Sequence, residues 1–251
     1  MKVSIITSCF NREATIKDAI ESVISQNYPD IEYIVIDGAS NDKSIEIIKQ
    51  YQQHIAKFIS EKDKGMYEAI NKGIKQATGD IIGLVHSDDF LYSKDTITHI
   101  VQQFERTGAD LIYGNGLFVD FYNTNKIIRN WKSGVYSKKK IRYGWLPLHP
   151  TVYIKKDCFQ QLGLYDESFK IAADSDLLIR YLYESNLKIS YLDEYIIKMR
   201  MGGLSTNPKK IKQKWSEDLK LYRNHGFMPL FTLGCKIISK IPQFITAKIT
   251  K

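Results

Sequence analysis

The sequence predicts an α/β fold in which helices cover a mostly parallel sheet. Runs of β-branched residues alternate with amphipathic segments of helical period through about the first hundred positions. Repeated strand–helix units of this length are typical of a parallel sheet with helices on its faces. The 251 residues are enough for one large domain with an added lobe or tail.

The elements of the first half follow in a regular order. Apolar runs predict strands at residues 3–7, 31–36, 58–59, 81–85 and 110–113. Apolar side chains spaced three and four apart predict helices at residues 13–26, 44–51, 67–77 and 96–104. Ligands bind beyond the carboxyl ends of such strands. We therefore expect residues 7–13, 37–42 and 86–89 to share one crevice.

The second half changes character. Short aromatic-rich strands at residues 118–122 and 127–131 predict an antiparallel addition, and helices are expected at 157–163 and 175–185. Paired glycines predict a flexible loop at 201–205. A polar helix at 209–223 and an amphipathic helix at 230–245 make up a C-terminal helical tail.

The positive charge of the chain belongs to that tail. Residues 207–251 carry ten Lys or Arg and two acidic residues, which equals the net charge of +8 of the whole chain. Nucleic-acid binders carry such charge on a folded reading surface, so no nucleic-acid partner is expected. A basic amphipathic tail favours an anionic membrane surface, with packing on its own domain or on a homodimer partner as the alternative.

The location of the protein is predicted from what the sequence lacks. No secretory signal and no run of about 20 apolar residues is present. The three cysteines match no metal spacing and are expected to be reduced thiols. The sequence therefore predicts a cytoplasmic protein, held peripherally on the inner face of the plasma membrane by its tail.

Two adjacent carboxylates, Asp88 and Asp89, directly follow a predicted buried strand. Like charges so close raise each other's pKa, and a divalent cation relieves the conflict. Mg²⁺ and Mn²⁺ favour carboxylate oxygen ligands. The alternative is an Asp pair that caps a turn or helix.

Residues 7–13 lack a glycine-rich phosphate loop, so neither a P-loop nor a dinucleotide fingerprint fits.

Four segments in order resemble the family-2 glycosyltransferases with the GT-A fold. They are Thr7 with Phe10-Asn11-Arg12-Glu13, then residues 35–42 around Asp37-Gly38, then 61–73 with Asp63-Lys64-Gly65, and 77–89 ending in Ser87-Asp88-Asp89. The resemblance implies a Rossmann-type GT-A catalytic domain at 1–206. Its nucleotide-sugar-binding half would be 1–115 and its acceptor-binding half 116–206, with 207–251 as the tail.

The resemblance also implies roles for single residues at the donor end. Thr7, Phe10, Asn11 and Glu13 would contact the nucleotide base, and Asp37 the uracil or ribose. Asp63, Lys64 and Gly65 would lie near the base and diphosphate, and Asn71 and Lys72 belong to a motif helix. Asp88 would approach the ribose or the metal, and Asp89 would ligate Mn²⁺ or Mg²⁺.

In the second half, residues 171–180 resemble the segment of the family that carries the catalytic carboxylate, although Ala173 replaces the usual Glu. Asp174 falls on the general base, which would take the proton of the attacking hydroxyl. A helix N-cap is the alternative. His149, Asp176 and Trp145 are candidates for contact with the acceptor or diphosphate. A buried structural histidine and a core aromatic are the alternatives for His149 and Trp145.

The expected function is transfer of a hexosyl or N-acetylhexosaminyl group, with inversion, from a UDP-sugar to a glycan or lipid-linked glycan. The resemblance places this in cell-surface polysaccharide or lipopolysaccharide biosynthesis. One alternative is a sugar-1-phosphate nucleotidylyltransferase, whose chemistry usually needs a glycine-rich loop after the first strand. The other is a non-catalytic nucleotide-sugar-binding protein, which Asp89 and Asp174 argue against.

Overall fold

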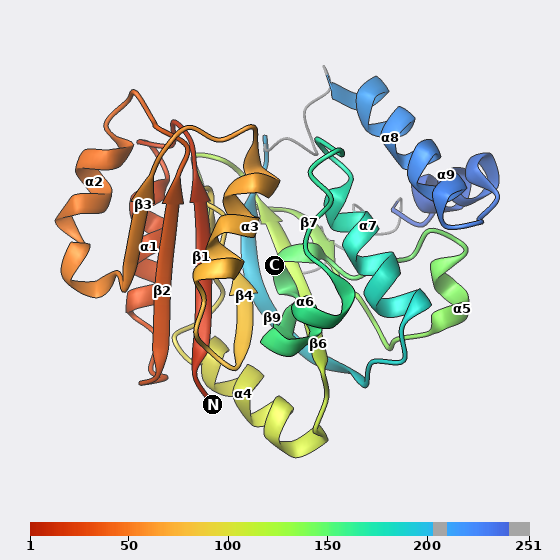
Figure 1. Cartoon of the computed structure of the whole chain (residues 1–251), viewed down its shortest axis with the longest axis horizontal. Coiled ribbons are helices and arrows are strands. Elements are labelled where there is room, and N and C mark those ends of the chain that lie inside the picture. Colours follow the sequence, from red (N-terminus) through yellow and green to blue (C-terminus); the bar gives the residue numbers. More distant parts are fainter. Residues whose placement is uncertain (203–209, 241–251) are drawn as a thin grey trace.

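The computed structural model describes residues 1–202 and 210–240, and these form one sheet with helices on both faces (Figure 1). The strand order is β3-β2-β1-β4-β8-β6-β9-β5, and β7 adds to β6. The strands are β1 (Val3–Cys9), β2 (Ile31–Asp37), β3 (Lys57–Ser60), β4 (Ile81–Leu84), β5 (Asp89–Leu91), β6 (Leu111–Val119), β7 (Ile127–Trp131), β8 (Tyr153–Lys155) and β9 (Ile189–Arg200). The predicted α/β fold class is confirmed.

The first four strands form the parallel part of the sheet. Successive side chains of β1 point to opposite faces, so Ile5 and Ile6 belong to two different hydrophobic clusters. The helices of this half are α1 (Ile16–Ile24), α2 (Ser44–Gln50), η1 (Gln52–His54), α3 (Met66–Gln76) and α4 (Thr96–Thr107). α1 and α4 cover one face and α3 covers the other, which explains why β1, β2 and β4 are mostly apolar.

The second half of the sheet contains both strand directions. β8 pairs antiparallel with β4 and β6, whereas β9 runs parallel to β6 and antiparallel to β5. The predicted strand at 118–122 ends at Val119, because the Asp120 side chain then accepts two backbone hydrogen bonds that close a turn. The expected helix at 175–185 is α7 (Ala173–Ile179) followed by a π-helical turn, η3 (Arg180–Glu184).

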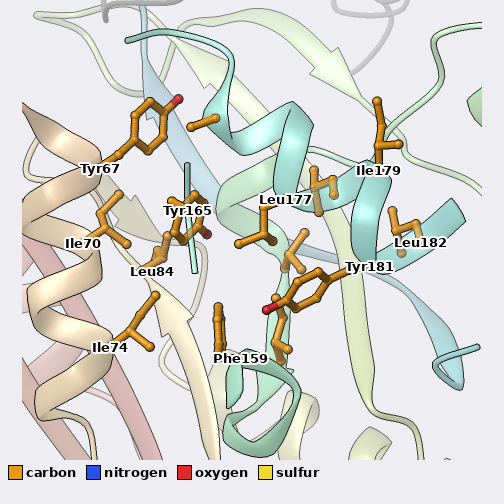
Figure 2. Packing of buried hydrophobic residues seen from close by; sticks show 14 of the residues in the cluster. Tyr67, Ile70, Ile74, Leu84, Phe159, Tyr165, Leu177, Ile179, Tyr181 and Leu182 are labelled. Atoms are coloured by element: carbon orange, nitrogen blue, oxygen red, sulfur yellow. The ribbon is translucent and has the colours of Figure 1, made fainter. Parts of the chain in front are cut away.

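The remaining helices cover the far end of the sheet. They are α5 (Lys138–Ile141), η2 (His149–Thr151), α6 (Lys156–Leu162), α8 (Ile211–Asn224) and α9 (Pro229–Ile238). Figure 2 shows Tyr67 and Ile70 of α3 facing Tyr165 and Leu177 across this part of the core.

The two tail helices pack on the domain that precedes them. Leu221, Tyr222 and Leu233 belong to the same buried cluster as Leu177 of α7. The division of the chain after residue 206 stays a prediction, although the described residues on its two sides share one core. Most of the predicted loop at 201–205, and the end of the predicted helix at 230–245, fall outside the described residues. None of the helices described is both long and apolar enough to cross a bilayer.

Candidate active site

A cavity of about 1410 Å³ lies beyond the carboxyl ends of β1 and β4. Residues 8–10, at the end of β1, and residues 86–89, after β4, line one side of it. The other side is lined from α7, α8 and α9, through Asp174, Lys214 and Lys236 among others. Ligand pockets usually measure about 300–1,000 Å³, so this cavity has room for two ligands side by side.

The paired carboxylates lie in this cavity, and Asp89 is the more buried of the two. Asp89 is only 2% exposed, and its Oδ2 has no hydrogen-bond partner among the described residues. Burial, and next the charge of Asp88, raise the pKa of Asp89 well above its usual range. A bound cation would favour the ionised carboxylate and would satisfy the orphaned oxygen.

The Asp pair fits a cation that also binds substrate phosphates. No group of three or more His, Cys, Asp or Glu side chains suited to a metal occurs in the described part of the chain. Mg²⁺ is commonly held by one or two carboxylates together with substrate phosphates. Asp88 and Asp89 would supply those carboxylates here, with the remaining oxygens coming from a diphosphate.

Arg200, which the sequence did not single out, supports the Asp pair. Its guanidinium donates to the backbone carbonyl of Asp88 at 3.1 Å and pairs with the carboxylate of Asp18. It also lies over the ring of Phe90, 5.0 Å from the centroid. Arg200 is 7% exposed and ends β9, so the last strand of the sheet fixes the loop that carries the carboxylates.

An exposed aromatic ring and a carboxylate face each other at the β1 end of the cavity. Phe10 is 57% exposed and lines the cavity together with Asp63 and Gly65. A Cβ atom on Gly38 would lie 2.6 Å from the Asp63 carboxylate and 3.4 Å from the Phe10 ring. Gly38 therefore leaves room for both side chains. A ring face beside a hydrogen-bond acceptor suits a nucleobase, which offers a planar surface and N–H donors.

Thr7 and Asp37 do not line the cavity. The Thr7 hydroxyl donates to the carbonyl of Val85 at 2.7 Å. Asp37 is fully buried and accepts hydrogen bonds from the Ser40 amide, the Ser40 hydroxyl and the Ser60 hydroxyl at 3.0, 2.5 and 2.7 Å. Both residues thus hold neighbouring strand ends together behind the cavity wall.

The other predicted donor-end residues also make contacts within the protein. The Asn11 side chain accepts from the Asn41 amide at 3.0 Å, and Asn11 has a left-handed φ of 52°. The remaining contacts are Glu13 with the Lys43 amide, the Lys64 amide with Glu68, Lys72 with Glu61 and Glu68, and Asn71 with Tyr165 and Glu167. None of Asn11, Glu13, Lys64, Asn71 and Lys72 lines the large cavity.

Asp174 lies in the first turn of α7 and faces the cavity. Its Oδ1 accepts from the amide of Ser175 at 2.7 Å. The segment just before it is held by Glu217 of α8, whose Oε2 accepts from the amides of residues 170, 171 and 172 at 3.0, 2.8 and 3.1 Å. We call these three hydrogen bonds to Glu217 a clamp. The sequence does not indicate it, since Glu217 and Asp218 are two acids in an otherwise basic helix.

His149 lines the cavity and is only 8% exposed. Its Nε2 is hydrogen-bonded to the Tyr165 hydroxyl at 2.7 Å, and its ring stacks on His86 with centroids 6.0 Å apart. Burial lowers the pKa of His149 to about 4. The imidazole is therefore neutral at pH 7 and can meet a ligand by hydrogen bonding but not by charge.

Trp145 and Asp176 differ in their position. Trp145 lines the cavity, and its indole N–H donates to the carbonyl of Ser133 at 3.0 Å. Asp176 points away from the cavity, where it pairs with Arg180 at 2.8 Å and with His225 at 3.0 Å. Of the three acceptor-side candidates, the structure thus places His149 and Trp145 in the cavity that Asp174 also lines.

Residues 4–163, which include the paired carboxylates, match the family model described as Glycosyl transferase family 2. The chain belongs to this family. Among curated relatives, a glycosyltransferase of Rickettsia typhi is 30% identical over 84% of this chain and 67% of its own length. A PGL/p-HBAD biosynthesis glycosyltransferase of Mycobacterium tuberculosis is 26% identical over 80% of this chain and 78% of its own.

Solved structures agree with this glycosyltransferase in fold. S. aureus TarS 1–349 in complex with UDP-GlcNAc has a TM-score of 0.69 at 20% identity, covering 88% of this chain and 65% of that one. A mannosyltransferase from Pyrobaculum calidifontis in complex with GDP-Man and Mn²⁺ has a TM-score of 0.66 at 15% identity, covering 98% and 73%. The present chain spans 39% of the longer TarS structure. At these identities the likeness establishes the GT-A fold.

Proposed function

We propose that this glycosyltransferase moves a hexosyl or N-acetylhexosaminyl group from a UDP-sugar to a hydroxyl of a glycan or lipid-linked glycan. The observation that carries the proposal is that one cavity holds both the Asp88–Asp89 pair and Asp174. The first suits a metal-bound diphosphate and the second suits a proton acceptor, and glycosyl transfer needs both. The complex of TarS with UDP-GlcNAc supports the choice of donor.

At the donor end, Phe10 and Asp63 would bind the base, while Asp88 and Asp89 would hold Mn²⁺ or Mg²⁺ on the diphosphate. The metal would supply positive charge that stabilises the departing diphosphate. Arg200 keeps the carboxylates in place through the Asp88 carbonyl. The Mn²⁺ in the mannosyltransferase complex supports a divalent ion in this site.

At the acceptor end, Asp174 would act as general base. The acceptor oxygen forms a bond to the anomeric carbon while the bond from that carbon to the diphosphate oxygen breaks. The hydroxyl proton passes to the Asp174 carboxylate. Attack opposite the leaving group inverts the anomeric centre. His149, held neutral by burial, would donate or accept a hydrogen bond beside this reaction without changing charge.

Asp174 and Asp89 give the sharpest test of this function. We expect slow hydrolysis of a UDP-sugar in the presence of Mn²⁺, lost in Asp89→Asn, and transfer to an acceptor lost in Asp174→Asn. Lys139→Gln, on the exposed surface of α5, is the control and should keep full activity. Binding of UDP-sugar without turnover would indicate the non-catalytic alternative. Release of pyrophosphate from UTP and a sugar 1-phosphate would indicate a nucleotidylyltransferase.

The cellular setting is part of the same proposal. α9 and the residue before it expose Met228, Leu230, Phe231 and Ile238, at 69, 78, 51 and 66%. Such an apolar surface on a basic tail suits the interface of an anionic membrane. We place the enzyme peripherally on the inner, cytoplasmic face of the plasma membrane, in polysaccharide or lipopolysaccharide biosynthesis.

Liposome sedimentation tests the membrane contact. Leu230→Ser combined with Phe231→Ser should reduce binding to anionic vesicles. Tyr122→Ser is the control, because Tyr122 is 93% exposed and lies in the turn after β6. If the double variant binds vesicles as the wild type does, the membrane role of α9 is wrong. A concentration-dependent dimer that the double variant abolishes would favour the homodimer alternative.

A further inference from the structure

The two ends of the cavity differ in charge. Its lining at the donor end is mixed, with the carboxylates of Asp63, Asp88 and Asp89 beside Arg12 and Arg200. Its lining beyond Asp174 is rich in cations, drawn from β7 and the segment after it, α5, α8, α9 and the turn after α9: Arg129, Lys132, Lys140, Lys214, Lys236 and Lys240. Asp174 itself and Asp218 are the acids that line this basic end. The proposed donor site does not use the cations of this end.

Four of these cations, Arg129, Lys214, Lys236 and Lys240, form a compact group that we call the cationic cluster. Burial, and next the charges of Lys236, Lys214 and Arg129, lower the pKa of Lys240 to about 7. Burial and Lys236 also lower the pKa of Lys214, whereas Asp174 acts in the opposite direction. The charges are thus close enough to repel one another, and Asp174 is within their range.

Arg129 is the fixed member of the cationic cluster. Its guanidinium lies 4.9 Å from the ring centroid of Phe118 and 4.4 Å from that of Trp131, and the residue is only 7% exposed. Stacking of this kind holds the planar fork in one orientation. Lys236 is also held, since it pairs with Asp218 at 2.8 Å. Positive charge is therefore built into the wall beside Asp174.

We propose that the cationic cluster binds a phosphoryl group of the acceptor, so that the acceptor of this enzyme is a phosphate-bearing glycan. The inference rests on the proposed function and names its acceptor class. A phosphoryl group carries up to two negative charges and several acceptor oxygens, which match a guanidinium fork with neighbouring ammonium groups. The cavity has room for it beside the donor, at about 1410 Å³.

The phosphoryl group could belong to a lipid-linked sugar phosphate or to a phosphodiester polymer. In both cases the anion would fix the acceptor with its hydroxyl near Asp174. Lys236 of α9 and Lys240 in the turn after it line the cavity, whereas Leu230 and Phe231 of α9 are exposed on the outside. An amphiphilic lipid phosphate would be matched by both faces of this helix.

The test measures binding at the cationic cluster without metal, so that the donor site contributes little. Tryptophan fluorescence is the readout, because Trp131 and Trp145 line the cavity. The probes are farnesyl phosphate in detergent, farnesol in the same detergent, and an oligomer of glycerol phosphate. We expect one or both phosphates to bind and farnesol not to bind. Farnesyl phosphate alone would indicate the lipid source, and the oligomer alone would indicate the polymer.

The variants are Lys240→Gln and Arg129→Gln. Each should raise the Kd for the bound phosphate about tenfold, because each loses a charge-assisted hydrogen bond. Lys139→Gln removes one positive charge outside the cavity and should leave the Kd unchanged. Arg129→Lys keeps the charge and should restore part of the affinity, even if loss of stacking on Trp131 destabilises the fold. Circular dichroism checks folding of every variant.

Three results would overturn the inference. They are equal affinity for farnesol and farnesyl phosphate, no binding of either phosphate, and unchanged affinity in both Lys240→Gln and Arg129→Gln. The KM for the UDP-sugar in the hydrolysis assay adds a separate readout. A rise of that KM in these two variants would assign the cluster to the donor diphosphate instead. If the wild-type protein binds phosphate but does not hydrolyse the UDP-sugar, the proposed function is refuted, whereas the inferred anion site is not.

Discussion

The contact between Glu217 and the segment before Asp174 predicts that a tail helix controls activity. One carboxylate oxygen of Glu217 accepts from three consecutive amides at 2.8–3.1 Å. Hydrogen bonds to charged groups contribute about 1.5–3 kcal/mol each. Because the three donors share one oxygen and Glu217 is half-exposed, we expect Glu217→Ala to lower the free energy of unfolding by about 3 kcal/mol in total.

The same substitution should affect catalysis through the position of Asp174. Misplacing a catalytic group by about 1 Å can cost roughly 100-fold in rate. We expect Glu217→Ala to reduce kcat of transfer by about 10- to 100-fold, with little change in the KM for the donor. Glu217→Gln keeps an acceptor oxygen and should lose about 1 kcal/mol and less activity. Urea unfolding and steady-state kinetics, measured with sugar transfer as the assay, report the two effects.

Glu105→Ala is the matched control for this prediction. Glu105 is an exposed glutamate on α4, a different helix from the one that carries Asp174. Its removal should change the free energy of unfolding by less than about 0.5 kcal/mol. If Glu217→Ala is destabilised by about 3 kcal/mol but transfers sugar at the wild-type kcat when fully folded, the clamp stabilises the fold without positioning the base.

Three further predictions concern single buried residues. Asp89→Asn should raise the metal-free melting temperature at pH 7. The pKa of Asp89 is raised in the folded protein, so the stability of the native state falls as pH rises above about 4. A lower melting temperature of the variant would contradict this. His149 binds a proton more weakly in the folded state, so its contribution, ~3 kcal/mol, should be lost as pH falls from about 6.5 to about 4. Urea unfolding of His149→Gln should show a smaller loss over that range. Gly83→Ala would place a Cβ 2.1 Å from the Tyr153 ring and should cost about 3 kcal/mol; a urea midpoint equal to that of the wild type would refute it.

The parallel half of the sheet could be predicted because its strands are buried on both faces. β1, β2 and β4 are almost entirely buried, so apolar runs of matching length mark them in the sequence. β9 was missed for the opposite reason. Only three of its twelve residues are buried, and Asp193 and Glu194 interrupt it. Its pairing with β6, far earlier in the chain, defines it and leaves no local pattern.

The site was predictable where a motif carried the chemistry. Phe10, Asp88 and Asp174, which the motifs singled out, line one cavity, and their roles stay predictions. Asp37 follows its strand as expected, but its oxygens are occupied by Ser40 and Ser60, and the contact with Ser60 depends on how β2 and β3 pair. Side-chain hydrogen bonds between distant segments follow from the folded backbone, and a single sequence does not reveal them.

Arg200 and Glu217 illustrate the same limit for supporting residues. Each holds a functional loop through backbone atoms, so the loop sequence contains no complementary side chain. Arg200 contacts Asp88 from the strand that pairs with β5, and Glu217 contacts residues 170–172 from a helix of the tail. The basic character of the tail indicates a role for its surface, whereas its buried contacts connect it to the segment before Asp174.

The position of Glu217 in the chain has a consequence for the order in which the enzyme becomes competent during its synthesis. Translation proceeds from the N-terminus, and N-terminal parts generally fold first. The parallel strands β1 to β4 are complete well before α8 is made, whereas Arg200, which holds the Asp88 carbonyl, follows only at the end of β9. Asp174 also leaves the ribosome before its clamp exists. We therefore expect a nascent chain to order the segment that carries Asp174 only once α8 has been added.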